Sequence, residues 1–189
     1  MKKPLSFLGC IIIVASLPSV ANSQVTDIEG NVYKTVKREA QTWMKENLKT
    51  TKFNDGSAIP LVENGSVWAK LKQPAYCWYE NDTTNKNIYG ALYNWYAVET
   101  GKLCPIGWHV PSDKVYLAEA PYPCASRQGY GGTYSLNLEP ESGCNYWTST
   151  ENSIDEAYSQ NVSWDGSKVT KGYYSLKNNG LPVRCIKDN

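Results

Sequence analysis

The chain has 189 residues, of which 19 are Lys or Arg and 18 are Asp or Glu, so its formal net charge is +1. This near-neutral balance argues against a protein that binds nucleic acid through a basic surface. Aromatic residues make up 12% of the chain, with 7 Trp and 14 Tyr but only 2 Phe, which excludes disorder over most of its length. We therefore expect one folded domain, preceded by any leader that the first residues form.

Residues 1–23 have the pattern of a signal peptide. Lys2 and Lys3 precede an apolar run over residues 5–17, and Ala21-Asn22-Ser23 offers small residues to a signal peptidase. The run has about 13 residues, fewer than the ~20 that a transmembrane helix needs. We expect cleavage after Ser23 and a mature domain over residues 24–189, exported to the periplasm, the outer-membrane surface or the medium, without a transmembrane segment.

An alternative leader type is a lipoprotein signal, because Phe7-Leu8-Gly9-Cys10 loosely resembles a lipobox. The apolar run continues after Cys10 instead of ending before it, which favours plain cleavage.

The first half of the mature chain predicts a strand and then helices. Residues 32–36 alternate apolar and polar side chains, as a strand does, and residues 41–48 form a second ordered element. Apolar residues at 89, 92, 93 and 96 fall on one helical face, so we expect a helix over residues 89–100, ended by Gly101. Ser112 and Asp113 can cap a second helix that runs toward Ala120.

The second half predicts a long irregular loop and then an antiparallel sheet. Residues 121–144 are rich in Pro, Gly and Tyr and have no period. Strands are expected over residues 146–150, 157–164, 168–174 and 181–187, with a hairpin at Asp165-Gly166. The order of elements indicates an α+β fold with two helices and a mainly antiparallel sheet.

Several stretches together resemble one family, the Fibrobacter succinogenes major paralogous domain of exported Bacteroidetes and Fibrobacter proteins. The stretches are Gly30–Val36, Gln41–Leu48, Tyr76–Asp82, Tyr89–Val98, Leu103–Asp113, Tyr146–Glu151 and Val183–Asp188. The family has no agreed activity. Its Gly-Trp-His-Val-Pro-Ser-Asp block and its terminal Arg-Cys strand look like those of C-type-lectin-like and sulfatase-modifying-factor folds, so the resemblance implies a C-type-lectin-like fold.

The cysteines are expected to stabilise this fold through disulfide bonds, as in other exported proteins. Five remain after the leader, an odd number. The lectin-like resemblance implies a disulfide between Cys104 and Cys185. Cys124 and Cys144 are absent from the usual family pattern and appear together, which predicts a second disulfide and leaves Cys77 as a thiol. A Cys77–Cys104 bond with Cys185 left as a thiol remains the alternative.

Catalysis is not expected. His109 is the only histidine, and no Ser or Cys stands near it in a recognisable nucleophile motif. We expect it to be a partly buried, hydrogen-bonded residue that shapes the turn into the second helix. No cysteine or histidine pair has the spacing of a zinc site.

The candidate ligand-binding residues lie in the second half of the chain. Glu139-Pro140-Glu141 and Trp164-Asp165 resemble the calcium- and sugar-binding motifs of C-type lectins, although a surface loop and a hairpin turn are the favoured interpretation. Trp147 and Trp164 are expected to be exposed. No cofactor is expected, and calcium is left open. The clusters Tyr76-Trp78-Tyr79 and Tyr93-Trp95-Tyr96 are expected mainly in the core, with sugar stacking as the alternative.

The sequence thus predicts an exported, non-catalytic binding module for an extracellular or envelope partner, with a glycan as one candidate. Two alternatives remain: a carbohydrate-active or sulfatase-modifying-factor-like enzyme, and a structural component of a surface appendage.

Overall fold

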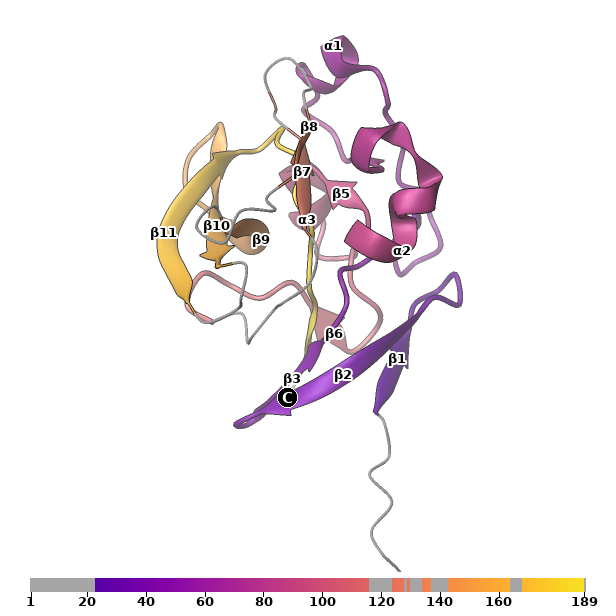
Figure 1. The fold of residues 1–189 in the computed structure, drawn as a ribbon, viewed down its shortest axis with the longest axis vertical. Helices are drawn as coiled ribbons and strands as arrows, with labels where there is room; N and C mark the ends of the chain where they lie inside the picture. Colours follow the sequence, from indigo (N-terminus) through magenta and orange to yellow (C-terminus); the bar gives the residue numbers. More distant parts are fainter. Residues whose placement is uncertain are drawn as a thin grey trace, which may run out of the picture.

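The computed structural model describes residues 23–115, 124–127, 129, 134–136, 143–163 and 168–188. It has mixed helices and sheets, with mostly antiparallel strands. In Figure 1 the three strands β9–β11 lie on one side of the central segments β5 and α3, and the helices α1 and α2 lie on the other. Strands β1–β3 close one end of the molecule. None of the helices in these ranges has the length and apolar character to cross a membrane.

A five-stranded sheet joins the two ends of the described chain. Its strand order is β1 (Gln24–Thr26), β2 (Val32–Arg38), β3 (Gln41–Met44), β12 (Ile186–Lys187) and β6 (Trp108–His109). The strand expected over residues 32–36 is therefore confirmed. Ile186 is in register with Trp43 on one side and with His109 on the other. The last strand is shorter than the 181–187 expected from the sequence.

A three-stranded antiparallel sheet follows the chain order predicted for the second half. It consists of β9 (Cys144–Glu151), β10 (Glu156–Val162) and β11 (Val169–Leu176). Val162 is in register with Val169, so β10 and β11 form the expected hairpin, although its turn lies outside the described residues. Ala157 and Ser159 are buried, so one face of β10 packs on the core.

The helix expected over residues 89–100 is wrong. The structure instead has α2 (Lys86–Tyr89), strand β5 (Leu92–Tyr93) and α3 (Trp95–Val98). Gly90 ends α2 at φ +73° and ψ −166°, a conformation that only glycine adopts readily. Strand β5 then pairs with β4 (Tyr76–Cys77), and the Asn94 side chain accepts a hydrogen bond from the Ala97 N–H to start α3.

The remaining helical elements are also short. They are α1 (Gly65–Trp68) and the 3₁₀ turns η1 (Tyr79–Asn81) and η2 (Thr83–Asn85). The helix expected from Ser112 begins as a turn, in which the Val115 N–H bonds to the Ser112 carbonyl, and residues 116–120 lie outside the described residues. The second predicted helix is therefore described only at its first turn.

The expected irregular loop over residues 121–144 contains regular structure. Strand β7 (Ala125–Arg127) pairs with β8 (Tyr134–Leu136). Residues 124–127 are buried, and the Arg127 guanidinium donates to the carbonyls of Val62 and Glu63 while lying 4.7 Å from the Trp68 ring centre. The described part of this segment therefore packs on the core, and the rest lies outside the described residues.

The core is built largely from aromatic side chains. Tyr76, Trp78, Tyr79, Tyr93 and Trp95 are all buried, as the core interpretation of the two aromatic clusters predicts, and Tyr96 alone is half-exposed. The structure forms the two expected disulfides, Cys104–Cys185 and Cys124–Cys144, and Cys77 is a buried thiol. The alternative Cys77–Cys104 pairing is not found.

Candidate functional site

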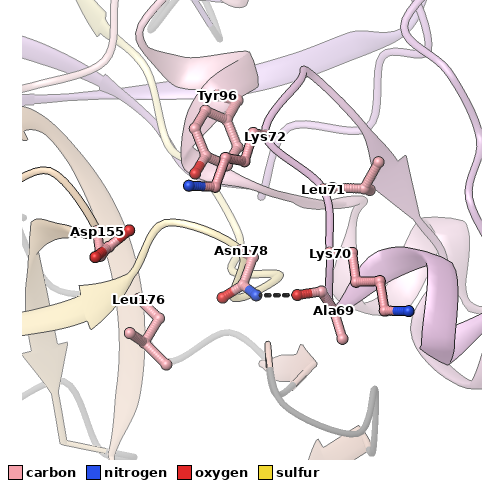
Figure 2. Close-up of a pocket in the computed structure, with 8 residues that line it drawn as sticks. All are labelled: Ala69, Lys70, Leu71, Lys72, Tyr96, Asp155, Leu176 and Asn178. Carbon is pink, nitrogen blue, oxygen red and sulfur yellow. Dashed lines mark hydrogen bonds between the residues drawn. The ribbon is translucent and has the colours of Figure 1, made fainter.

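A pocket of about 210 Å³ opens between elements far apart in the sequence (Figure 2). It lies where the segment after α1, helix α3, the β9–β10 turn and the end of β11 meet. The described residues that line it are Ala69, Lys70, Leu71, Lys72, Tyr96, Asp155, Leu176 and Asn178. Apolar and charged side chains alternate around it, which is typical of a site that both packs on a ligand and orients it.

One wall is fixed by α1 and by the turn after β11. The Asn64 side chain accepts from the Val67 N–H and begins α1, and Trp68 is then fully buried. The Trp68 indole N–H donates to the Asn178 carbonyl at 2.6 Å. In return, the Asn178 side-chain amide donates to the Ala69 carbonyl at 2.8 Å, as Figure 2 shows. Asn178 is thus a structural part of the pocket.

The opposite wall is fixed by α3. Trp95 is buried, and its indole N–H donates to the Thr148 carbonyl at 3.0 Å, so the next residue, Tyr96, faces the pocket. Burial raises the pKa of the Tyr96 hydroxyl, and the negative charges of Asp155 and Glu99 raise it further. The hydroxyl therefore stays protonated at neutral pH, where it can both donate and accept a hydrogen bond.

The third wall is the β9–β10 turn, which carries Asp155. The Asp155 carbonyl accepts from the Lys177 N–H at 2.9 Å, and the Lys177 carbonyl accepts from the Trp95 N–H at 2.8 Å. Lys177 therefore links the turn to α3 through its backbone. Its buried ammonium reinforces the link by contacting the Glu151 carboxylate and the Ile154 carbonyl.

Four charged or hydroxyl-bearing side chains among the described lining residues form no hydrogen bond or ion pair: Lys70, Lys72, Tyr96 and Asp155. In Figure 2 the Lys70 ammonium points away from the other three. In Figure 2 the Lys72 ammonium and the Tyr96 hydroxyl lie toward the side of the pocket where Asp155 projects. This side of the pocket therefore offers one cationic donor, one anionic acceptor and one hydroxyl to a ligand.

A second pocket, of about 220 Å³, differs in its chemistry. It is lined by Thr26, Asp27, Ile28, Asn54, Pro105 and Ile106. Its one charged group, Asp27, already accepts hydrogen bonds from the Glu29 N–H, from the backbone and side chain of Asn31 and from the Tyr33 hydroxyl. It therefore offers mainly apolar contacts.

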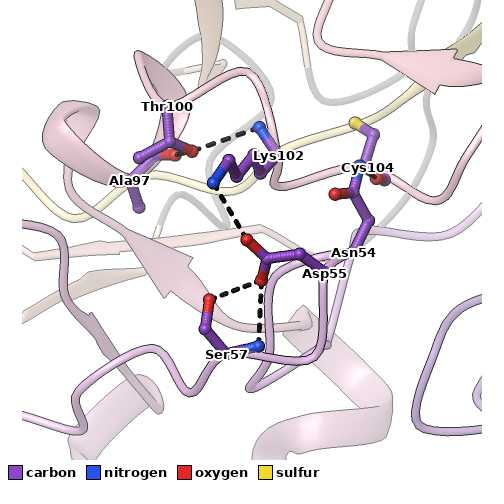
Figure 3. Close-up of polar contacts among 7 residues, drawn as sticks. All are labelled: Asn54, Asp55, Ser57, Ala97, Thr100, Lys102 and Cys104. Atoms are coloured by element: carbon purple, nitrogen blue, oxygen red, sulfur yellow. Dashed lines mark hydrogen bonds and ion pairs between the residues drawn. The ribbon is translucent and has the colours of Figure 1, made fainter.

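Polar contacts hold the loop that carries Asn54, as Figure 3 shows. The Asn54 side chain donates to the Cys104 carbonyl at 3.0 Å, and the Lys102 ammonium lies 2.9 Å from the Asp55 carboxylate. Hydrogen bonds from Ser57 and Lys102 hold the pKa of Asp55 well below its usual range. These contacts fasten the loop to the segment around Lys102 and Cys104, so this loop is structural support.

Of the ligand-binding residues predicted from the sequence, only Trp147 lies in the described part of the chain, and it does not line this pocket. Trp147 is 1% exposed and its indole N–H donates to the Tyr93 carbonyl at 2.8 Å, so the expectation that it is exposed is wrong. It lies on the face of β9 that packs on the core. Glu139, Glu141, Trp164 and Asp165 lie outside the described residues. Among the residues that the structure does describe, no cluster of His, Cys, Asp or Glu has metal-binding geometry.

His109 is more exposed than expected. Its side chain is 52% exposed, and its Nδ1 lies 2.5 Å from an Asp188 carboxylate oxygen. The backbone of His109 pairs with Ile186 at the edge of the five-stranded sheet. The expected hydrogen bond is present, but the side chain is more exposed than expected because His109 lies on an edge strand.

Sequence reasoning missed the residues that build the pocket. Tyr96 was assigned to a helical face, and Lys72, Asp155 and Lys177 had no motif to mark them. The available signal was the pair of turns around Asp155 and Asn178, because the first turn and the end of the third strand of an antiparallel three-stranded sheet lie at the same end of it. Only the fold shows that α1 and α3 reach that end.

Comparison with known proteins identifies a domain in the first part of the chain. Residues 36–118 match the family model of the Fibrobacter succinogenes major domain. The matched region includes Lys72 and Tyr96 and ends before Asp155 and Asn178, so the pocket spans its boundary. The motifs at residues 146–151 and 183–188 lie beyond the match. No curated protein and no solved structure matches the chain.

Proposed function

We propose that this chain, which carries a Fibrobacter succinogenes major domain over residues 36–118, is an exported, non-catalytic binding module. The observation that carries the proposal is the pocket in which Lys72, Tyr96 and Asp155 lack partners. Unpartnered polar groups that converge on a preformed pocket are the usual basis of ligand recognition. The partner is an extracellular or envelope component, and a glycan fits the mixed polar and apolar lining best.

The chemistry of the pocket favours binding over turnover. Asp155 is the one carboxylate among the described lining residues, whereas glycoside hydrolysis ordinarily uses a facing pair. His109, the single histidine, lies on β6 and does not line the pocket. Among the lining residues that the structure describes, there is neither a general base with a partner nor a nucleophile.

Export is supported by the leader pattern of residues 1–23 and by the two disulfides, which are consistent with an oxidising compartment. The bond between Cys104 and Cys185 also supports a C-type-lectin-like fold, because it ties a segment near the middle of the chain to the final strand. Intact-mass analysis of the protein from its native host should give a chain that begins at Gln24. A lipid adduct on Cys10 would contradict this leader type.

The binding proposal is tested by capture of envelope components and by a glycan array, each with wild-type protein and Asp155→Asn. The variant removes the charge of a side chain without a protein partner, so it should fold normally and lose most of the captured material. Asp188→Asn is the matched control, because Asp188 contacts His109 far from the pocket lining. Equal capture by all three proteins would refute the pocket as the site, and turnover of a captured glycan would refute the non-catalytic assignment.

A further inference from the structure

Two tyrosines form an exposed pair on the outer face of β10 and β11. Tyr158 is in register with Tyr174, so their side chains project from the same face of the hairpin as direct neighbours. The residues on either side of Tyr158, Ala157 and Ser159, are buried, so that face points away from the core. Tyr174 is 57% exposed and Tyr158 is half-exposed. The pair presents aromatic surface to solvent.

This aromatic surface leads directly into the pocket. Leu176 follows Tyr174 by two residues in an uninterrupted part of the ladder, so both lie on the same face of β11. Two residues of a strand advance about 7 Å. Leu176 lines the pocket and is in register with Glu156 on β10. Glu156 directly follows Asp155, which also lines the pocket. Tyr174, Leu176 and the pocket therefore form one continuous surface.

The tyrosine pair and the pocket, at the two ends of this surface, can contact the ring face and the hydroxyl groups of a sugar chain. Tyrosine rings pack on the apolar C–H face of a pyranose ring, and the hydroxyl groups of a sugar both donate and accept hydrogen bonds. The pocket offers a donor at Lys72, an acceptor at Asp155 and both at Tyr96. Because Lys72 and Asp155 carry opposite charges, a polyanion or a polycation would be repelled by one of them, whereas a neutral chain of hydroxyl groups satisfies both.

We infer that the pocket binds one sugar unit of a neutral oligosaccharide, whose chain continues over Leu176 onto Tyr174 and Tyr158. This inference rests on the proposed function, because it assumes that the pocket is the binding site. It adds the ligand class and a second subsite, and it requires that affinity depends on the length of the saccharide.

The test is calorimetric titration of the full chain with cellohexaose, xylohexaose, mannohexaose and hexa-N-acetylchitohexaose, and with the corresponding monosaccharides. At least one hexasaccharide should bind at least tenfold more tightly than its monosaccharide. Tyr174→Ala should lower the affinity for that hexasaccharide by about tenfold, because one stacking contact is lost. The affinity for the monosaccharide, which occupies the pocket alone, should not change. Tyr173→Ala is the matched control, since Tyr173 is in register with the buried Ser159 and starts from the other face of β11.

Three results would overturn the inference: no binding by any hexasaccharide, no gain of affinity with length, or equal affinity of the Tyr173 and Tyr174 variants. These results leave the proposed function standing if Asp155→Asn still abolishes capture of envelope components. If Asp155→Asn captures as wild type does, the proposed function itself fails.

Discussion

The ammonium group of Lys177 lies 4.9 Å from the centre of the Trp95 indole ring. From this buried position it also contacts the Glu151 carboxylate and donates to the Ile154 carbonyl at 3.0 Å. The side chain therefore joins α3, which carries Tyr96, to the β9–β10 turn, which carries Asp155. Lys177 does not line the pocket, and it acts as a positioning residue for two walls of it.

Lys177→Met should destabilise the fold and weaken ligand binding. The variant keeps the apolar stem but loses the cation–π contact, the ion pair and the hydrogen bond, so we expect the free energy of unfolding to fall by about 2 kcal/mol. Lys102→Met, which removes an exposed ion pair with Asp55, should change stability less. Urea unfolding measures both. An equal loss in the two variants would contradict the role of Lys177.

Gly90→Ala should be much more destabilising than Gly101→Ala. Both glycines have positive φ, but a Cβ at Gly90 would lie 2.7 Å from the Asn47 Cβ and from the Leu48 carbonyl oxygen, whereas a Cβ at Gly101 meets nothing within 4 Å. Backbone strain alone costs about 1–2 kcal/mol, and the collision adds a further ~1–3 kcal/mol at Gly90. Thermal or urea unfolding of the two variants decides the point, and similar losses would show that Gly90 is not the tight contact.

The two disulfides should contribute unequally to stability. Cys104–Cys185 closes a sequence separation of 81 residues and Cys124–Cys144 one of 20. The chain-entropy relation gives about 4–5 kcal/mol for the first and about 3 kcal/mol for the second. Paired Cys→Ala variants should therefore rank in that order in urea unfolding, and non-reducing peptide mapping should find neither pair crosslinked to Cys77. A reversed ranking would mean that loop closure does not dominate.

Alkaline pH should destabilise the protein through its buried tyrosines. Burial raises the pKa of the Tyr33 hydroxyl, and its hydrogen bond to Asp27 and the charge of Asp27 raise it further. In the unfolded chain a tyrosine loses its proton near pH 10. The folded state keeps the proton, so the stabilising contribution is complete below about pH 10 and declines as the pH rises above it.

Tyr33→Phe separates this effect from the rest of the fold. The variant should be less stable than wild type at pH 8, by about 1–2 kcal/mol, because Asp27 and the Lys49 N–H lose a hydrogen-bond partner. Between pH 10 and 11 its free energy of unfolding should fall less steeply than that of the wild type. Parallel curves in urea unfolding at several pH values would contradict the assignment to Tyr33.

Local patterns predicted the strands well and the helices poorly. Alternation at residues 32–36 and a turn signal at Asp165-Gly166 are local, and β2 and the β10–β11 hairpin follow them. The helical spacing of Tyr89, Leu92, Tyr93 and Tyr96 was misleading, because Leu92 and Tyr93 are buried by a long-range pairing with Tyr76 and Cys77. Helical periodicity reports burial on one side, and it cannot distinguish a helix from two short elements around a glycine.

The candidate site could not be predicted from the sequence, because long-range contacts form it. Trp147 was expected at the surface, yet its indole N–H donates to the Tyr93 carbonyl in the core. Asp155 and Tyr96, in contrast, sit in ordinary sequence surroundings. Their importance comes from the meeting of a turn and a helix that are 59 residues apart in the sequence, and no local pattern encodes that meeting.

The most direct test of the central claim is to map the bound ligand by chemical-shift changes in a ¹H–¹⁵N NMR titration of the full chain with a captured envelope glycan. The account predicts that the largest changes cluster at Tyr96, Asp155, Leu176 and Asn178, extend along β11 to Tyr174, and disappear in Asp155→Asn. Changes that instead cluster at Ile28 and Ile106 in the second pocket, or within residues 121–142, with the first pocket unaffected, would contradict it.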